Sequence, residues 1–96
     1  MVAMGITRIN DFRAKEGKAE ALRAFLAQMI PSIASCRGCV SCKLLQSQDS
    51  PDRFVILEVW DSIESHKAAV EDIPPEMLVT VMELLDGKPS GEYFKE

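Results

Sequence analysis

Apolar and polar positions follow two different spacings along the chain. In four short segments, apolar and β-branched residues alternate with polar ones or run together, which is typical of β-strands. Asp49-Ser50-Pro51-Asp52 has the composition of a turn and separates the second of these segments from the third, so we expect the two to pair as an antiparallel hairpin. The expected strands are residues 4–12, 39–48, 53–60 and 92–95.

Between these segments, apolar residues recur every three or four positions, the spacing of amphipathic helices. The first expected helix, residues 21–33, contains Pro31, which should end or bend it because proline lacks an N–H and crowds the preceding turn. A second, short helix begins after the capping pair Asp61-Ser62 and is broken by Pro74-Pro75. A third is expected over residues 76–85.

The resulting order, β-α-β-β-α-(α)-β, predicts an α+β fold of the ferredoxin-like split βαβ type. It forms one domain, residues 1–96, in which helices cover one face of a four-stranded antiparallel sheet. The third strand is apolar on both sides: Phe54, Ile56 and Trp60 alternate with Val55, Leu57 and Val59. A single helical layer leaves the second apolar face in water, so a second copy should cover it, and we expect a homodimer.

Composition excludes several classes of partner. The chain has 96 residues, 47% of them hydrophobic, and a formal charge of -4, without a cluster of basic and aromatic residues. Nucleic acid is therefore not an expected partner. No segment approaches the eighteen or so apolar residues of a membrane span, and residues 1–4 do not resemble the start of a signal peptide. We expect no membrane association and a cytoplasmic protein.

Three cysteines, Cys36, Cys39 and Cys42, form a C-x-x-C-x-x-C pattern that suggests a metal site. A fourth ligand is missing, and alternation along the expected strand would place Cys39 and Cys42 on opposite faces. We therefore expect no metal. Small, soft core residues are the favoured interpretation, with a redox function as the alternative.

Three segments carry a resemblance to a known family: Gly17 with Glu20-Ala21-Leu22, residues 38–42, and residues 54–62. Together they resemble the antibiotic biosynthesis monooxygenase superfamily, and Glu58-x-Trp60-x-Ser62 is the most specific part. The resemblance implies a dimeric α+β barrel with a pocket between the sheet and the helices of each subunit. Members include cofactor-free oxygenases of phenolic and anthrone-like aromatics, haem-degrading enzymes and an isomerase.

The resemblance also suggests site residues on the strands. Asn10 aligns with a strand asparagine of the haem-degrading relatives, although a backbone-satisfied strand end is an equal alternative. Trp60 matches the strand tryptophan of quinone-forming oxygenases, but their polar partner four residues earlier is Ile56 here, and a buried structural tryptophan that needs only a backbone acceptor is the favoured alternative. Glu58 shares the face of Trp60 and is a candidate buried acid with a raised pKa, or a hydrogen-bonding residue.

His66, the single histidine, is the candidate general base on the helix above the pocket. Family histidines on this helix commonly fall eight or nine residues after the strand tryptophan, at positions held here by Ala68 and Ala69, so the direction of His66 is open. The haem-degrading branch also requires a tryptophan at Ala69 and a histidine at Val79, and both are absent.

The leading hypothesis is a cofactor-independent monooxygenase of a small aromatic or quinol-like metabolite. Such chemistry needs a dry pocket, a proton acceptor and donors for the substrate anion, and no cofactor. The alternatives are a small-molecule binding or isomerising protein on the same scaffold, and a structural dimerisation module. An enclosed polar cavity would favour chemistry, and a filled one would favour structure. The candidate catalytic residues are Asn10, Trp60 and His66, and the candidate pocket residues are Phe25, Met29, Ile56, Glu58 and Met77.

Overall fold

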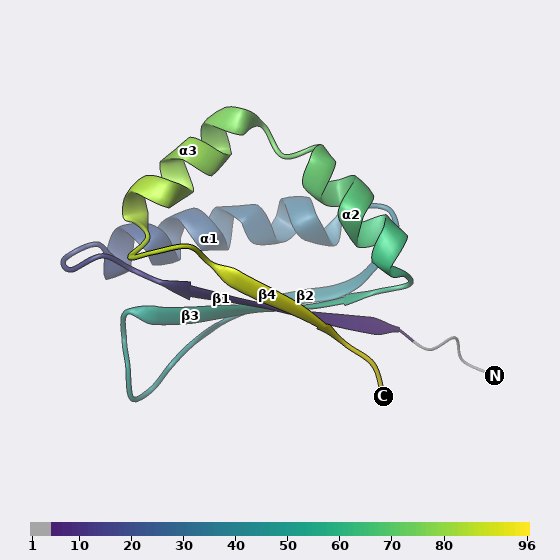
Figure 1. Ribbon diagram of the computed structural model, residues 1–96, viewed down its shortest axis with the longest axis horizontal. Coiled ribbons are helices and arrows are strands. Elements are labelled where there is room, and N and C mark those ends of the chain that lie inside the picture. The colour runs from purple at the N-terminus through teal and green to yellow at the C-terminus, as the bar shows by residue number, and fades with distance from the viewer. Residues whose placement is uncertain (1–4) are drawn as a thin grey trace.

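The computed structural model describes residues 5–96 and consists of four strands and three helices (Figure 1). In chain order the elements are β1 (Ile6–Arg13), α1 (Ala19–Ala34), β2 (Cys39–Gln46), β3 (Arg53–Trp60), α2 (Ile63–Glu71), α3 (Pro75–Leu84) and β4 (Ser90–Phe94). The strands form one antiparallel sheet in the order β2-β3-β1-β4. All three helices lie on one side of this sheet. The predicted fold class is confirmed.

Some element ends differ from the predicted ones. α1 continues through Pro31 to Ala34, so this proline does not end the helix; it lies in the last turns, where the backbone N–H of Ser35 still reaches the Pro31 carbonyl at 3.1 Å. β4 begins at Ser90, earlier than expected, because its pairing with β1 extends to Asp11. The expected start of the first strand at residue 4 lies outside the described residues, as does the segment compared with a signal peptide.

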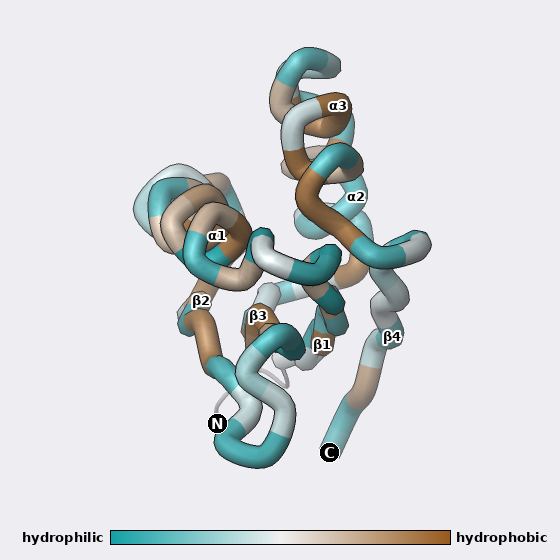
Figure 2. Tube along the Cα trace, turned by 90° about the vertical axis from the view of Figure 1, so that its left-hand side faces the viewer, coloured by the Kyte–Doolittle hydropathy of each residue, from teal (hydrophilic) through white to brown (hydrophobic). Residues whose placement is uncertain are grey.

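The apolar core lies between the helices and the middle of the sheet. Its buried members come from α1, β3, α3 and the segments that flank β1 and α3. Figure 2 shows α1 above the β2 side of the sheet and α2 and α3 above the side formed by β1 and β4. The core residues are Ala14, Leu22, Leu26, Phe54, Ile56, Val81 and Leu85.

A β-bulge at the start of β2 changes the direction of its side chains. Cys39 pairs with Trp60, whereas Cys42 pairs with Glu58, and the register shifts by one residue between Cys39 and Ser41. Because a bulge places an extra residue on one strand, it reverses the alternation beyond it. Cys39 and Cys42 therefore lie on the same, helix-facing side as their partners. The argument that strand alternation separates these two cysteines was wrong.

The opposite face of the sheet has no cover within one chain. Val55, Leu57 and Val59 alternate with the buried residues of β3 and are half-buried on this face, and Leu45 and Phe94 are exposed on the two edge strands. None of the described helices is long and apolar enough to span a bilayer. Covering of the bare face by a second copy stays a prediction.

Candidate functional site

A row of four side chains crosses the helix-facing side of the sheet. Cys42 on β2 pairs with Glu58 on β3, Glu58 pairs with Arg8 on β1, and Arg8 pairs with Tyr93 on β4. Directly paired residues in an antiparallel sheet carry their side chains on the same face. Polar groups from all four strands thus meet under the helices.

Glu58 is the centre of this row and is 4% exposed. Its Oε1 accepts a hydrogen bond from the Trp60 indole N–H at 2.7 Å, and its Oε2 accepts one from the Asn10 amide Nδ2 at 2.8 Å. Burial raises the pKa of Glu58 above its ordinary value, and this effect is partly opposed by Trp60, Arg8 and Asn10, in that order. The two donors predicted from the sequence therefore converge on one internal carboxylate.

His66 faces this cluster from α2. The Ser62 hydroxyl caps the helix by accepting from the Ser65 backbone N–H at 3.1 Å, so His66 lies about one turn into α2, directly above the end of β3. It is 7% exposed, and its ring meets that of Trp60 edge-on at 5.5 Å. The open question of its direction is thus answered: the side chain points toward the sheet.

The two ring nitrogens of His66 have different neighbours. Nδ1 lies 2.5 Å from the Tyr93 hydroxyl, and Nε2 lies 3.8 Å from Glu58 Oε1. Burial lowers the pKa of His66, and the charge of Arg8 lowers it further. At neutral pH the imidazole is therefore mainly uncharged, so its contact with Glu58 is not an ion pair. The order Tyr93, His66, Glu58 is suited to moving a proton.

Arg8 and Tyr93 belong to the site but were not among the predicted residues. Arg8 Nε donates to Asn10 Oδ1 at 2.9 Å, and the guanidinium carbon lies 4.6 Å from the centroid of the Tyr93 ring. The alternation in β1 did place Arg8 on the face of Asn10, and a charged residue on a helix-facing side was a usable signal. Tyr93 could not be found in this way because its position depends on the pairing of β4 with β1.

Four of the five predicted pocket residues lie outside the hydrogen-bonded cluster around Glu58. Ile56 is a buried core residue and Phe25 packs against the core, while Met29 and Met77 are half-buried on their helices. Among the five, Glu58 joins the hydrogen-bonded cluster. A role for the other four in binding a substrate stays a prediction.

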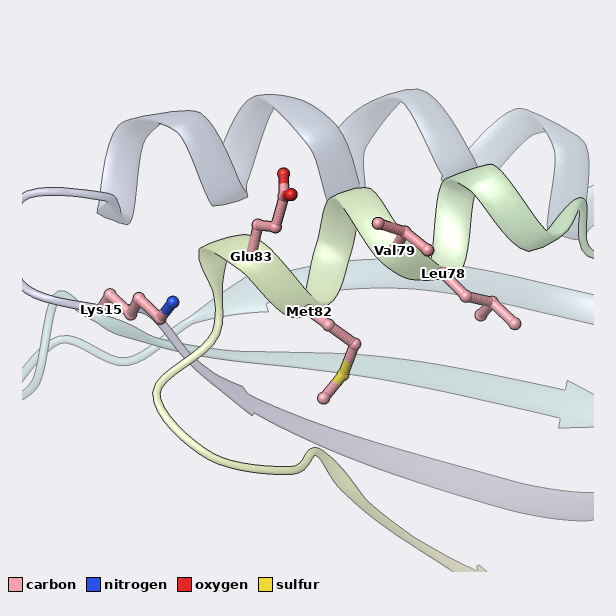
Figure 3. A pocket seen from close by; sticks show the side chains of 5 residues that line it. All are labelled: Lys15, Leu78, Val79, Met82 and Glu83. Atoms are coloured by element: carbon pink, nitrogen blue, oxygen red, sulfur yellow. The ribbon is translucent and has the colours of Figure 1, made fainter.

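Two hollows on the described part of the chain lie away from Glu58. One, of about 430 Å³, lies against the outer side of α3, where Figure 3 shows its lining residues Lys15, Leu78, Val79, Met82 and Glu83. The other, of about 160 Å³, is formed by β1 and β4 at the uncovered face. Neither hollow is lined by a residue of the Glu58 cluster, so neither is the enclosed polar cavity that would favour chemistry, and every buried polar side-chain atom among residues 5–96 has a partner.

Cys42 lies beside Glu58 on the β2 side of the site. Burial, followed by the charge of Glu58, raises the pKa of Cys42 to about 12, so this thiol stays protonated. All three cysteines are free, and in residues 5–96 no group of three or more His, Cys, Asp or Glu side chains is arranged to hold a metal ion. That the chain binds no metal stays a prediction.

The fold and the sequence together define the class of this protein. Residues 5–72 match the family described as antibiotic biosynthesis monooxygenase, and the chain belongs to this family. No curated protein gives a significant match.

Solved structures resemble the chain over nearly its whole length. A protein of Shewanella oneidensis is 26% identical, with a TM-score of 0.83 and coverage of 99% of this chain and 93% of the other. A protein of Mycobacterium tuberculosis is 25% identical, with a TM-score of 0.81 and coverage of 94% and 92%. A candidate antibiotic biosynthesis monooxygenase of Nitrosomonas europaea has a TM-score of 0.86 at 21% identity, covering 100% and 93%, and shows likeness of fold alone.

Proposed function

We propose that the protein is a cofactor-independent monooxygenase of a small aromatic or quinol-like metabolite, with Glu58 as the group that accepts the substrate proton. The observation that carries this proposal is the buried carboxylate of Glu58, held by two N–H donors and 3.8 Å from His66. Burial of a carboxylate strengthens it as a base, because the charged form is destabilised.

The reaction proceeds in two stages. Glu58 removes a proton from an activated C–H or O–H group, and the resulting electron-rich anion reduces dioxygen itself. Overall, a ring CH₂ group and O₂ give a carbonyl and water, so the substrate supplies all the electrons. Asn10 and Trp60, freed from Glu58 when it becomes protonated, donate to the oxyanion of the substrate. His66, positioned by Tyr93, carries the proton away from Glu58.

The proposal includes a homodimer, in which the uncovered sheet faces of two copies pack together. Val55, Leu57 and Val59 form the apolar centre of that face in β3. Their burial against a second copy would remove apolar surface from water at a gain of about 25 cal/mol per Å².

A second candidate is an isomerase or binding protein on the same scaffold. Asn10 and Trp60, the two donors proposed for the oxyanion, are already engaged by Glu58, and Ile56 offers no further donor, so these two can stabilise an oxyanion only by changing partner. Moving a proton between two carbon atoms needs less: a buried base and a neighbouring relay, which Glu58 and His66 supply.

Oxygen uptake over a panel of anthrones, quinols and catechols tests the proposal. Glu58→Gln should lower turnover by about a hundredfold to ten-thousandfold, as expected for loss of a general base, and His66→Ala by about a hundredfold. Asn10→Ala and Trp60→Phe should cost about a hundredfold to a thousandfold each. Glu64→Gln, on the exposed side of α2, is the matched control and should leave turnover unchanged.

The isomerase alternative predicts a different result in the same experiment. The parent would then consume no oxygen, yet would exchange substrate C–H hydrogens with deuterium from solvent, and Glu58→Gln would abolish the exchange. Unchanged oxygen uptake in all the site variants would refute the monooxygenase assignment.

A further inference from the structure

Arg8 and Glu58 face each other across β1 and β3 but do not form an ion pair. The two residues are directly opposite each other in the sheet, a position in which oppositely charged side chains usually form a cross-strand ion pair. Glu58 instead accepts from Asn10 and Trp60, and in the described part of the chain no carboxylate oxygen lies within 4.0 Å of the Arg8 guanidinium. The arginine therefore carries a positive charge beside Glu58 that no direct ion pair neutralises, although this charge lowers the pKa of Glu58.

The neighbours of Arg8 orient it without neutralising it. Nε is fixed on Asn10 Oδ1, and the flat guanidinium group lies over the Tyr93 ring. Its terminal nitrogens have no acceptor among residues 5–96, and since no buried polar side-chain atom lacks a partner there, these nitrogens reach solvent. A planar donor pair that is held still and open to solvent is suited to a carboxylate, which accepts from both nitrogens at once.

Gly91 on β4 makes room for this arrangement. It pairs with Asn10, and a Cβ atom at this position would overlap the terminal nitrogen Nη2 of Arg8 and lie 2.6 Å from both Arg8 Cζ and Asn10 Oδ1. The backbone of β4 can approach the guanidinium group closely because residue 91 has no side chain. Arg8, Asn10 and Gly91 thus form one packed unit next to Glu58, where β1 lies between β3 and β4.

We infer that Arg8, positioned by Asn10, Tyr93 and Gly91, binds a carboxylate of the substrate, so that the ligand of this site is a small aromatic acid. The inference rests on the proposed function in assigning the ligand to the Glu58 site, but binding itself requires no turnover. A carboxylate bound at Arg8 would also change the basicity of Glu58 and His66. Arg8 lowers the pKa of both Glu58 and His66, so a bound carboxylate that offsets its charge makes both groups better proton acceptors.

Binding of benzoate compared with benzamide, its neutral analogue of nearly the same shape, tests the inference. Trp60 is the single tryptophan and donates to Glu58, so its fluorescence reports on the site, and calorimetry gives an independent affinity. The parent should bind benzoate about tenfold to a hundredfold more tightly than benzamide, the range expected for a charge-assisted pair. Arg8→Gln should remove the preference, and Arg8→Lys should keep part of it.

Two further variants separate recognition from general charge and from folding. Gly91→Ala keeps every charge but displaces the guanidinium group, and it should weaken benzoate binding by about tenfold. Arg13→Gln removes an exposed arginine of the same strand, which pairs with Asp52 at 3.3 Å, and should change nothing. Urea unfolding establishes that each variant is folded.

A parent protein without preference for benzoate, including one that binds neither probe, would overturn the inference. So would equal losses in Arg8→Gln and Arg13→Gln. A selective benzoate site in a protein that consumes no oxygen would leave the inference standing and remove the monooxygenase assignment instead, because the two measurements are independent.

Discussion

Glu58→Gln is the substitution that separates the charge of the buried carboxylate from its shape. The side chains have nearly the same size, but glutamine offers one acceptor oxygen and an NH₂ group in place of two acceptor oxygens. Asn10 and Trp60 each donate to a different oxygen of Glu58. In the variant one of these N–H groups loses its acceptor in a site that excludes water, at a cost of about 1–3 kcal/mol at every pH.

The charge acts in the opposite direction, and its effect depends on pH. Because burial raises the pKa of Glu58 above 4.5, the folded chain binds more protons than the unfolded chain between 4.5 and the raised value. The free energy of unfolding of the parent therefore falls as the pH rises through this window, by about 1.4 kcal/mol for each unit by which the pKa is raised. The variant has no such group, so its disadvantage should be largest near pH 4 and should shrink toward pH 7.

Urea unfolding followed by Trp60 fluorescence at several pH values between 4 and 7 measures this difference, at one fixed chain concentration. Asp11, whose pKa is lowered by its hydrogen bond with Arg53, contributes a slope that is common to both proteins, and His66, with its lowered pKa, contributes a slope of its own. Glu71→Gln, an exposed glutamate at the end of α2, is the control and should parallel the parent. A difference between parent and Glu58→Gln that stays constant, or grows with pH, would refute the reasoning.

Three other predictions concern assembly, a turn and the cysteines. Leu57→Lys should convert a dimer to monomers or unfold the chain, as seen by light scattering, whereas Val79→Lys on exposed α3 should not; a monomeric parent would contradict this. Gly38→Ala should cost more free energy of unfolding than Gly17→Ala: both glycines have positive φ, but a Cβ at Gly38 would lie 2.5 Å from Ser65 Oγ, whereas nothing lies within 4 Å at Gly17. Elemental analysis should find zinc and iron well below one ion per chain, and one tightly held ion would contradict the metal-free expectation.

The fold could be predicted from the sequence because its main signals are local. Helical spacing before Ser35 and the turn residues before Arg53 fix the order of the elements, and the apolar character of both sides of β3 indicates two packed faces. The bulge at Val40 could not be predicted, since it is defined by the register of β2 against β3 rather than by the residues of β2. Pro31 was expected to end or bend the helix near its last turns, and α1 continues past it only to Ala34.

The sequence could predict individual site residues but not the contacts between them. Asn10 and Trp60 were chosen from the family resemblance and His66 as the single histidine, and the structure brings all three to Glu58. The sequence could not show that Asn10 and Trp60 satisfy a carboxylate of the protein, because that depends on distances between neighbouring strands. Nor could it show Tyr93 beside His66, since the two residues meet through the pairing of β4 with β1.

The row that crosses all four strands is assembled from segments that are made at different times during synthesis. Arg8 is made early and Glu58 midway, but Tyr93 belongs to the last strand in chain order, which docks against β1 from the opposite end of the sequence. Contacts between such distant segments form late in folding, because the loop between them must close first. A nascent chain that has already folded β1, β2 and β3 therefore has the base, but it gains Tyr93, which positions the His66 relay, only when β4 adds to the edge of the sheet.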